Sequence, residues 1–180
     1  MLTGTDYADA DLIKKERKMI IVEMILMGIF ATYFMDLLAG FLIKRKLIQS
    51  FIKAEAVGRW FLSMFRGKFI HEDIHKTPEL KKEKLWGFIS HYLIGIVLAG
   101  IYLFLELKVP AIRDQRWMAL VFGIATVILP WFWMFPSMGF GFLASKSPDK
   151  PGIIRTSLIN HTNFGLGFFI WIVFFHRFFI

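Results

Sequence analysis

Residues 19–43 read MIIVEMILMGIFATYFMDLLAGFLI, an apolar run in which only Glu23 and Asp36 are charged. At the helical rise of roughly 1.5 Å per residue, this run is long enough to cross the roughly 30 Å hydrocarbon layer of a membrane. Three further runs, at about 85–107, 117–138 and 156–177, have the same character. Because unpaired strand edges cannot face lipid, these runs predict an all-α, integral membrane four-helix bundle.

The first run is also much longer than the apolar stretch of a cleavable signal peptide, which indicates a retained helix. We therefore expect a charged N-terminal segment over residues 1–18 and a single transmembrane domain over residues 19–180. The composition agrees with this organisation, because 56% of the 180 residues are apolar, more than an ordinary soluble domain carries.

Several classes of function have no support in the sequence. The chain contains no cysteine, which excludes a disulfide scaffold, a thiolate zinc site, an iron–sulfur cluster and a cysteine nucleophile. It has no glycine-rich phosphate loop, no Gly-x-Ser-x-Gly motif and no paired carboxylates, so nothing indicates nucleotide hydrolysis, serine hydrolysis or glycoside cleavage. Whether the protein is an enzyme stays open at this point.

The positive charge is concentrated between the first two apolar runs. Residues 44–84 hold eleven of the 22 basic residues, and their surplus over acids accounts for +6 of the net charge of +8. Apolar residues recur at helical spacing over about 47–66, which predicts an amphipathic interfacial helix on the membrane surface. We expect anionic lipid headgroups, rather than nucleic acid, to be the partners of this region. The expected headgroup contacts are Lys44, Arg45, Lys46 and Lys53.

The distribution of basic residues also predicts an orientation. With four crossings, fourteen of the 22 basic residues lie on the side that carries the 44–84 and 139–155 loops, and eight lie on the other side. The positive-inside rule therefore predicts that these two loops are cytoplasmic.

Three polar residues inside the apolar runs are costly in hydrocarbon and therefore informative, namely Asp36, His91 and His161. Each belongs to a row of small residues spaced by four, a pattern that favours close packing of helices. All three also lie six to eight residues from a basic residue on the same side of the membrane. We therefore expect them to point inward and to form one polar cluster near the 44–84 loop. Such a cluster either fixes the register of the bundle through hydrogen bonds or binds a metal, a cofactor or a proton.

Residues 71–75 fit the His-Glu-x-x-His pattern of zinc proteases, in which two histidines on one helix hold the metal. The pattern lies in a charged loop between Gly67 and Pro78, which leaves little room for that helix. A second interpretation is that His71 folds over the end of the bundle and joins the polar cluster. Residues at the rim of such a site would be Arg59, Trp60, Asn160 and Asn163.

The expected ligand set is thus Asp36, His71, His91 and His161. Nitrogen and oxygen donors of this kind suit a divalent ion of zinc, iron or copper, and haem with two axial histidines is a further option. Four other residues receive no role in this site. We expect His75 and His176 to face solvent or an interface, and Glu23 and Glu106 to reach water at helix ends.

Several of these residues also form longer patterns that resemble a known family. The patterns include Gly28-x-x-Ala31-Thr32-x-x-Met35-Asp36-Leu37, Gly87-x-x-x-His91-Tyr92-x-Ile94-Gly95 and Ser157-Leu158-x-x-His161-x-x-Phe164-Gly165-x-Gly167. Together they resemble a family of small, uncharacterised bacterial inner-membrane proteins known only as a domain of unknown function. The resemblance covers about residues 24–170.

This resemblance implies four membrane helices in a bacterial inner membrane, but no activity, substrate or cofactor. It places the family's aspartate and histidines on Asp36, His71, His91 and His161. His75 is not part of the pattern, which counts against a zinc protease.

The leading expectation is a multi-pass membrane protein with a buried Asp/His site, near one membrane face, that binds a metal ion or cofactor. One alternative is a non-catalytic accessory or assembly subunit whose basic segment docks on lipid or on a larger membrane complex. Another is a small proton-coupled transporter, which would need a polar path to both faces. A homo-oligomer is compatible with each of these functions.

Overall fold

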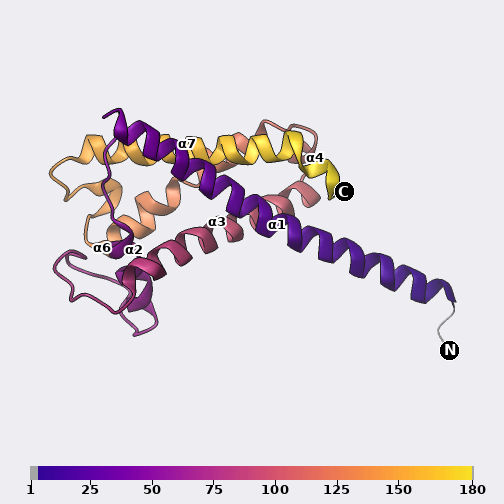
Figure 1. Cartoon of the computed structure of the whole chain (residues 1–180), viewed down its shortest axis with the longest axis horizontal. Coiled ribbons are helices and arrows are strands. Elements are labelled where there is room, and N and C mark those ends of the chain that lie inside the picture. The colour runs from indigo at the N-terminus through magenta and orange to yellow at the C-terminus, as the bar shows by residue number, and fades with distance from the viewer. Residues whose placement is uncertain (1–3, 180) are drawn as a thin grey trace.

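The computed structural model describes the backbone of residues 4–179 and the side chains of residues 14–179, and all of its regular structure is helical. Figure 1 shows α2 and α6 at one end of the molecule, and α4 and both termini toward the other. The elements in chain order are α1 (Gly4–Lys44), α2 (Ala54–Met64), α3 (Glu83–Lys108), α4 (Pro110–Arg113), α5 (Met118–Ala125), η1 (Pro130–Met134), α6 (Phe135–Met138), η2 (Phe142–Ala144), α7 (Lys150–Phe174) and η3 (His176–Phe178).

Four helical segments are long and apolar enough to cross a membrane. They span Lys14–Lys44, Glu83–Lys108, Met118–Met138 and Lys150–Phe174. This result confirms the predicted all-α fold with four membrane-length helices, and the chain is a membrane protein.

Helix α1 runs without a break through the predicted boundary between residues 18 and 19, because the charged residues before that boundary are good helix formers. It stops at Lys44, and the left-handed backbone of Lys46 (φ 59°) turns the chain. This turn allows the Leu47 N–H to bond to the carbonyl oxygen of Leu42.

The helices pack through their small residues, as the rows spaced by four predicted. A methyl group added at Gly28 would lie 2.4 Å from the Ile96 Cα atom, and one at Gly95 would lie 2.1 Å from the Thr32 hydroxyl oxygen. These approaches join α1 to α3, while α7 packs against both α1 and α5. The core between them is apolar and contains Met27, Ala31, Leu98, Ala99, Tyr102, Phe164 and Phe168.

The third membrane segment is not a regular helix. After α5 it continues through the π-helical turn η1 and the short α6. Pro130 and Pro136 lie at the starts of these two elements; because proline lacks an N–H group, it breaks the regular hydrogen-bond ladder. Gly139, whose φ is +96°, then turns the chain out of α6. The irregular backbone of η1 forms one wall of the cavity described below.

The helix in the first long loop is shorter than expected and is not free on a surface. It contains eleven residues, Ala54–Met64, within the range of 47–66 that the pattern predicted. Gly58 lies against the carbonyl group of Glu83, and Gly87 lies against that of Ala54, so α2 packs closely on the start of α3. Arg59 is buried in this contact.

Candidate functional site

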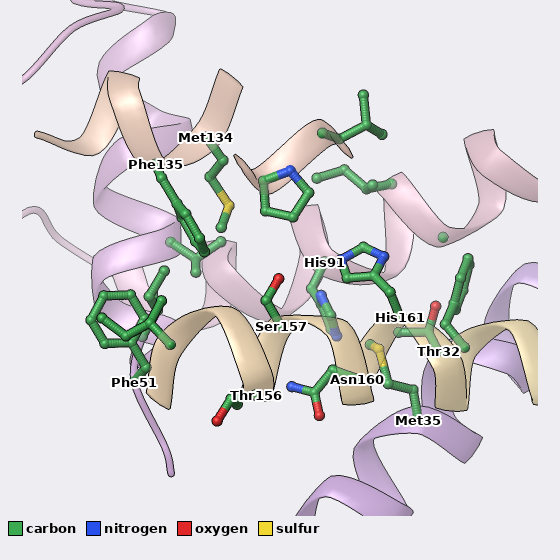
Figure 2. Close-up of a pocket in the computed structure, with 18 of the residues that line it drawn as sticks. Thr32, Met35, Phe51, His91, Met134, Phe135, Thr156, Ser157, Asn160 and His161 are labelled. Carbon is green, nitrogen blue, oxygen red and sulfur yellow. The ribbon is translucent and has the colours of Figure 1, made fainter. Parts of the chain in front are cut away.

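A cavity of about 340 Å³ lies inside the bundle, between α1, α3, η1 and α7. Figure 2 shows His91 of α3 and His161 of α7 side by side along it, with Ser157 of α7 beside them and Asn160 of α7 below them. Most of the remaining lining is apolar, and it extends to Phe51 in the loop that precedes α2. A mainly apolar cavity with a few convergent polar groups is typical of a small-molecule site.

His161 is fixed by the third membrane segment. Its Nδ1 atom lies 2.8 Å from the Thr126 hydroxyl oxygen, and that hydroxyl donates its only proton to the Gly123 carbonyl oxygen at 2.6 Å. Both contacts are hydrogen bonds only if His161 Nδ1 carries a proton and donates it to Thr126. In the neutral ring, Nε2 is therefore the nitrogen with a free lone pair.

The close approach of α5 to α7 makes this bond geometrically feasible. A methyl group added at Gly123 would lie 2.1 Å from the Gly165 Cα atom. The two backbones are thus in contact, one turn from Thr126 along α5 and one turn from His161 along α7.

His91 is fixed by a carboxylate. Its Nε2 atom lies 3.1 Å from Asp36 Oδ1, and the neighbouring Tyr92 hydroxyl donates to Asp36 Oδ2 at 3.3 Å. A carboxylate can only accept, so Nε2 of His91 donates and Nδ1 keeps the lone pair in the neutral ring. Each cavity histidine therefore has one nitrogen bonded outward and one free, the arrangement that orients histidine ligands.

The structure brings Asp36, His91 and His161 near one another, but it does not arrange them as one metal-binding set. Asp36 pairs with His91 but does not line the cavity, and the side chains of both residues are about 40% exposed. His161 pairs with Thr126 instead of Asp36. Within residues 14–179, no group of three or more histidine and carboxylate side chains is arranged to hold a metal ion.

His71 does not reach the cavity either. Its backbone N–H donates to the Ser137 carbonyl oxygen, and its ring Nδ1 lies 3.0 Å from the Thr77 hydroxyl oxygen. Burial, reinforced by the positive charges of Lys68 and Arg59, lowers the pKa of His71 below its usual value of 6.5. This histidine is therefore a neutral, buried part of the loop that docks on α6.

The zinc-protease pattern has no helix in the structure, because residues 71–75 form bends and turns. His71 is buried, whereas His75 is exposed and its ring packs beside Phe140. The two histidines therefore do not share one helix face.

The four expected rim residues divide into two pairs. Trp60 and Asn160 line the cavity, and the Trp60 indole N–H donates to the Ser137 hydroxyl oxygen at 2.7 Å. Arg59 points elsewhere, because its guanidinium forms two hydrogen bonds to the Glu83 carboxylate at 2.7 and 2.9 Å. Asn163 is buried outside the cavity lining.

Two cavity residues carry polar atoms without partners. The Thr32 hydroxyl oxygen and the Asn160 Oδ1 atom are both buried and make no hydrogen bond with a described residue. Because unsatisfied buried polar atoms cost free energy, these two atoms represent unused hydrogen-bonding capacity in residues of the cavity wall.

Sequence reasoning did not identify Thr126 and Tyr92, the residues that bond to His161 and Asp36. The available signal was a hydroxyl group inside an apolar run in each case. The sequence pattern also predicted no role in a site for Glu23, Glu106 and His176, which the structure brings together at the other end of the bundle. The expected headgroup residues Lys44, Arg45, Lys46 and Lys53 are exposed.

Comparisons with known proteins agree with the expectation of an uncharacterised family. No curated protein and no solved structure matches the chain. Residues 25–174, most of the length, match the family described as "protein of unknown function (DUF2938)". The chain belongs to this family.

Proposed function

We propose that this membrane protein binds a small, largely apolar cofactor or ligand in the cavity, with His91 Nδ1 and His161 Nε2 as the groups that contact its polar part. The main support for the proposal is that each of the two imidazole rings is hydrogen-bonded through one of its nitrogens. Asp36 and Thr126 each hold one nitrogen of a cavity histidine, which leaves the other nitrogen with a free lone pair. Rings held in this way are oriented before any ligand arrives, which reduces the entropic cost of binding.

The chemistry of the cavity restricts the ligand. Two imidazole lone pairs accept hydrogen bonds or coordinate a metal centre, and the Thr32 hydroxyl and Asn160 carbonyl oxygen add one donor and one acceptor. Two histidines do not complete a coordination shell for zinc, which almost always takes four ligands in structural sites. A metal would therefore need further ligands from the molecule that carries it, as in a metal-containing cofactor.

The test is to purify the full chain from membranes and to identify what accompanies it. Elemental analysis and an optical spectrum detect a metal or a coloured cofactor, and solvent extraction with mass spectrometry detects an organic ligand. We expect the bound molecule to be lost in His161→Ala and reduced in His91→Ala. His75→Ala is the matched control, because His75 is exposed and outside the cavity.

Two results would overturn the proposal. One is purified protein without any stoichiometric metal or organic molecule, and without uptake of either from a membrane extract. The other is a bound molecule whose amount is the same in His161→Ala, His91→Ala and the control.

The Thr126→Val variant keeps the shape of the side chain but removes its hydroxyl group. It should weaken binding of the molecule while folding is retained.

We also propose a bacterial inner-membrane location in which the 44–84 loop faces the cytoplasm and its exposed lysines and Arg45 contact anionic headgroups. The excess of basic residues in the 44–84 and 139–155 loops supports this orientation. This orientation places the carboxyl terminus in the periplasm. A reporter enzyme that works only in the periplasm should therefore be active when it is fused after Ile180, and activity of a reporter that works only in the cytoplasm would contradict the orientation.

A further inference from the structure

Three titratable side chains meet at the end of the bundle opposite the 44–84 loop. His176 of η3 lies between Glu23 of α1 and Glu106 of α3, with Nδ1 2.7 Å from Glu23 Oε1 and Nε2 3.7 Å from Glu106 Oε2. The carboxylate side chains are only 3% and 9% exposed. They are therefore largely buried and do not extend freely into water as helix-end residues were expected to do, because the segment after α7 folds back over them.

The hydrogen bonds distinguish the two carboxylates. Glu23 Oε1 accepts from His176 Nδ1–H at 2.7 Å and from the Trp171 indole N–H at 3.1 Å. Two donors therefore converge on one oxygen of Glu23. Within the described residues, no hydrogen bond reaches Glu106, whose contact with His176 is longer than a hydrogen bond.

The charges around Glu106 do not balance when both carboxylates are ionised. One imidazolium cannot neutralise two carboxylates, and α7 contributes only the neutral Trp171 to the cluster. On α3, Tyr102 lies one turn before Glu106, and its fully buried hydroxyl has no partner. The next cation that acts on His176 is Arg116, in the segment between α4 and α5.

The contacts of His176 favour its charged form. The hydrogen bond to Glu23 raises the pKa of His176 above its usual value of 6.5, against the opposing effect of burial. Since Glu23 and His176 form a charge-balanced pair, the excess negative charge falls on Glu106. A buried carboxylate without hydrogen-bond donors neutralises itself most simply by taking up a proton.

We propose that Glu23, Glu106 and His176 form a proton-binding site at the membrane face opposite the ligand cavity, in which Glu106 carries the bound proton. One proton moves from water to a carboxylate oxygen of Glu106, and no covalent bond other than this O–H forms. The unpartnered Tyr102 hydroxyl, which lies on the same face of α3, marks unused hydrogen-bonding capacity beside the proton. The site shares no residue with the ligand cavity, so this proposal stands apart from the proposed function.

The proton exchanges with water on its own face of the membrane. The residues between this site and the cavity belong to the buried apolar core, including Met27, Ala31, Ala99 and Phe168. Apart from the Tyr102 hydroxyl at the end nearest Glu106, the residues named here offer no hydrogen-bonding side chains that would pass a proton onward. A path to both faces, which a proton-coupled transporter needs, is therefore closed in this conformation.

Infrared spectroscopy of the purified full chain in lipid vesicles tests the site directly. A protonated carboxyl group gives a C=O stretching band that an ionised one lacks. We expect this band in the wild type at neutral pH, and we expect Glu106→Gln to remove it. The control is Glu79→Gln, because the Glu79 side chain is 88% exposed and its loss should leave the band unchanged.

A second measurement separates a proton site from a structural ion pair. If Glu106 is protonated, Glu106→Gln imitates the native state, so the thermal unfolding midpoint should be equal to or above that of the wild type from about pH 5 to 9, the range that brackets carboxyl and imidazole titration. If Glu106 serves as an anion that pairs with His176, the same variant should unfold at a lower temperature.

The proposal is overturned if the band is absent at neutral pH, if it persists in Glu106→Gln, or if that variant is less stable than the wild type while Glu79→Gln is not. Ligand retention in Glu106→Gln should equal that of the wild type. The two proposals can therefore fail separately.

Discussion

The replacement Gly123→Ala tests how the cavity is built. Its added methyl carbon would lie 2.1 Å from the Gly165 Cα atom, whereas non-bonded carbon atoms rest at roughly 3.5 to 4.0 Å. The neighbour is backbone and cannot rotate away. Helices α5 and α7 must therefore separate by about 1.4 Å, taking the lower end of that contact range, and the 2.8 Å bond between Thr126 and His161 is lost.

The expected loss of free energy of unfolding is defined relative to a matched control variant. Gly40 is also a helical glycine, but a methyl group added there meets nothing within 4 Å. Both replacements by alanine gain the same helix propensity, so their difference isolates the packing. Overpacking costs about 1–3 kcal/mol, and the lost hydrogen bond adds about 1 kcal/mol. We expect Gly123→Ala to be about 2–4 kcal/mol less stable than Gly40→Ala, by the sum of these two effects.

Reversible denaturation in mixed micelles, followed by circular dichroism, measures both free energies of unfolding. Nitrogen chemical shifts of His161 provide a second readout, because loss of the Thr126 bond frees the ring to change tautomer. Free energies of the two variants within about 0.5 kcal/mol of each other, the usual error of such comparisons, would refute the close contact between α5 and α7. An unchanged His161 spectrum in Gly123→Ala would refute its role in fixing the ring.

Two further predictions concern the loop end of the bundle. Arg59→Met should destabilise the protein by about 3–5 kcal/mol, because it leaves the buried carboxylate of Glu83 unpaired. The double variant Arg59→Met/Glu83→Leu should lose less free energy of unfolding in the same denaturation experiment. Equal losses in the two variants would contradict the buried pair. His71 has a lowered pKa in the folded protein, so the unfolded chain binds more protons below about pH 6.5 and stability should fall on acidification. His71→Gln should flatten this acid decline in thermal melts, and an unchanged decline would assign it to another group.

The sequence predicts the membrane helices well because hydropathy is a property of each segment alone. Each of the four apolar runs corresponds to a membrane-length helical segment. The rows of small residues also identify real contacts, as the approach of Gly28 to the Ile96 backbone shows. These contacts could be predicted because glycine permits an approach that larger residues exclude.

The pairing of the polar side chains could not be predicted in the same way. Residue spacing places Asp36 and His91 on particular helix faces, but it does not fix the angle at which those helices cross. In the structure both residues lie at the edge of the α1–α3 contact and are partly exposed. His161 faces α5 instead, so its partner is Thr126. Rotating one helix by a fraction of a turn about its axis would exchange one polar partner for another. The spacing of residues in the sequence does not define that rotation.

The roles of Glu23 and Glu106 depended on a segment far away in the sequence. Each lies near the end of an apolar run, where a carboxylate ordinarily extends to water. The turn after α7 places His176 between them, and no local pattern encodes this return of the chain. Polar groups therefore lie toward both ends of the bundle, with a closed apolar core between them. Any coupling between the cavity and the proposed proton site must pass through movement of α1, α3 and α7, the helices that contribute to both.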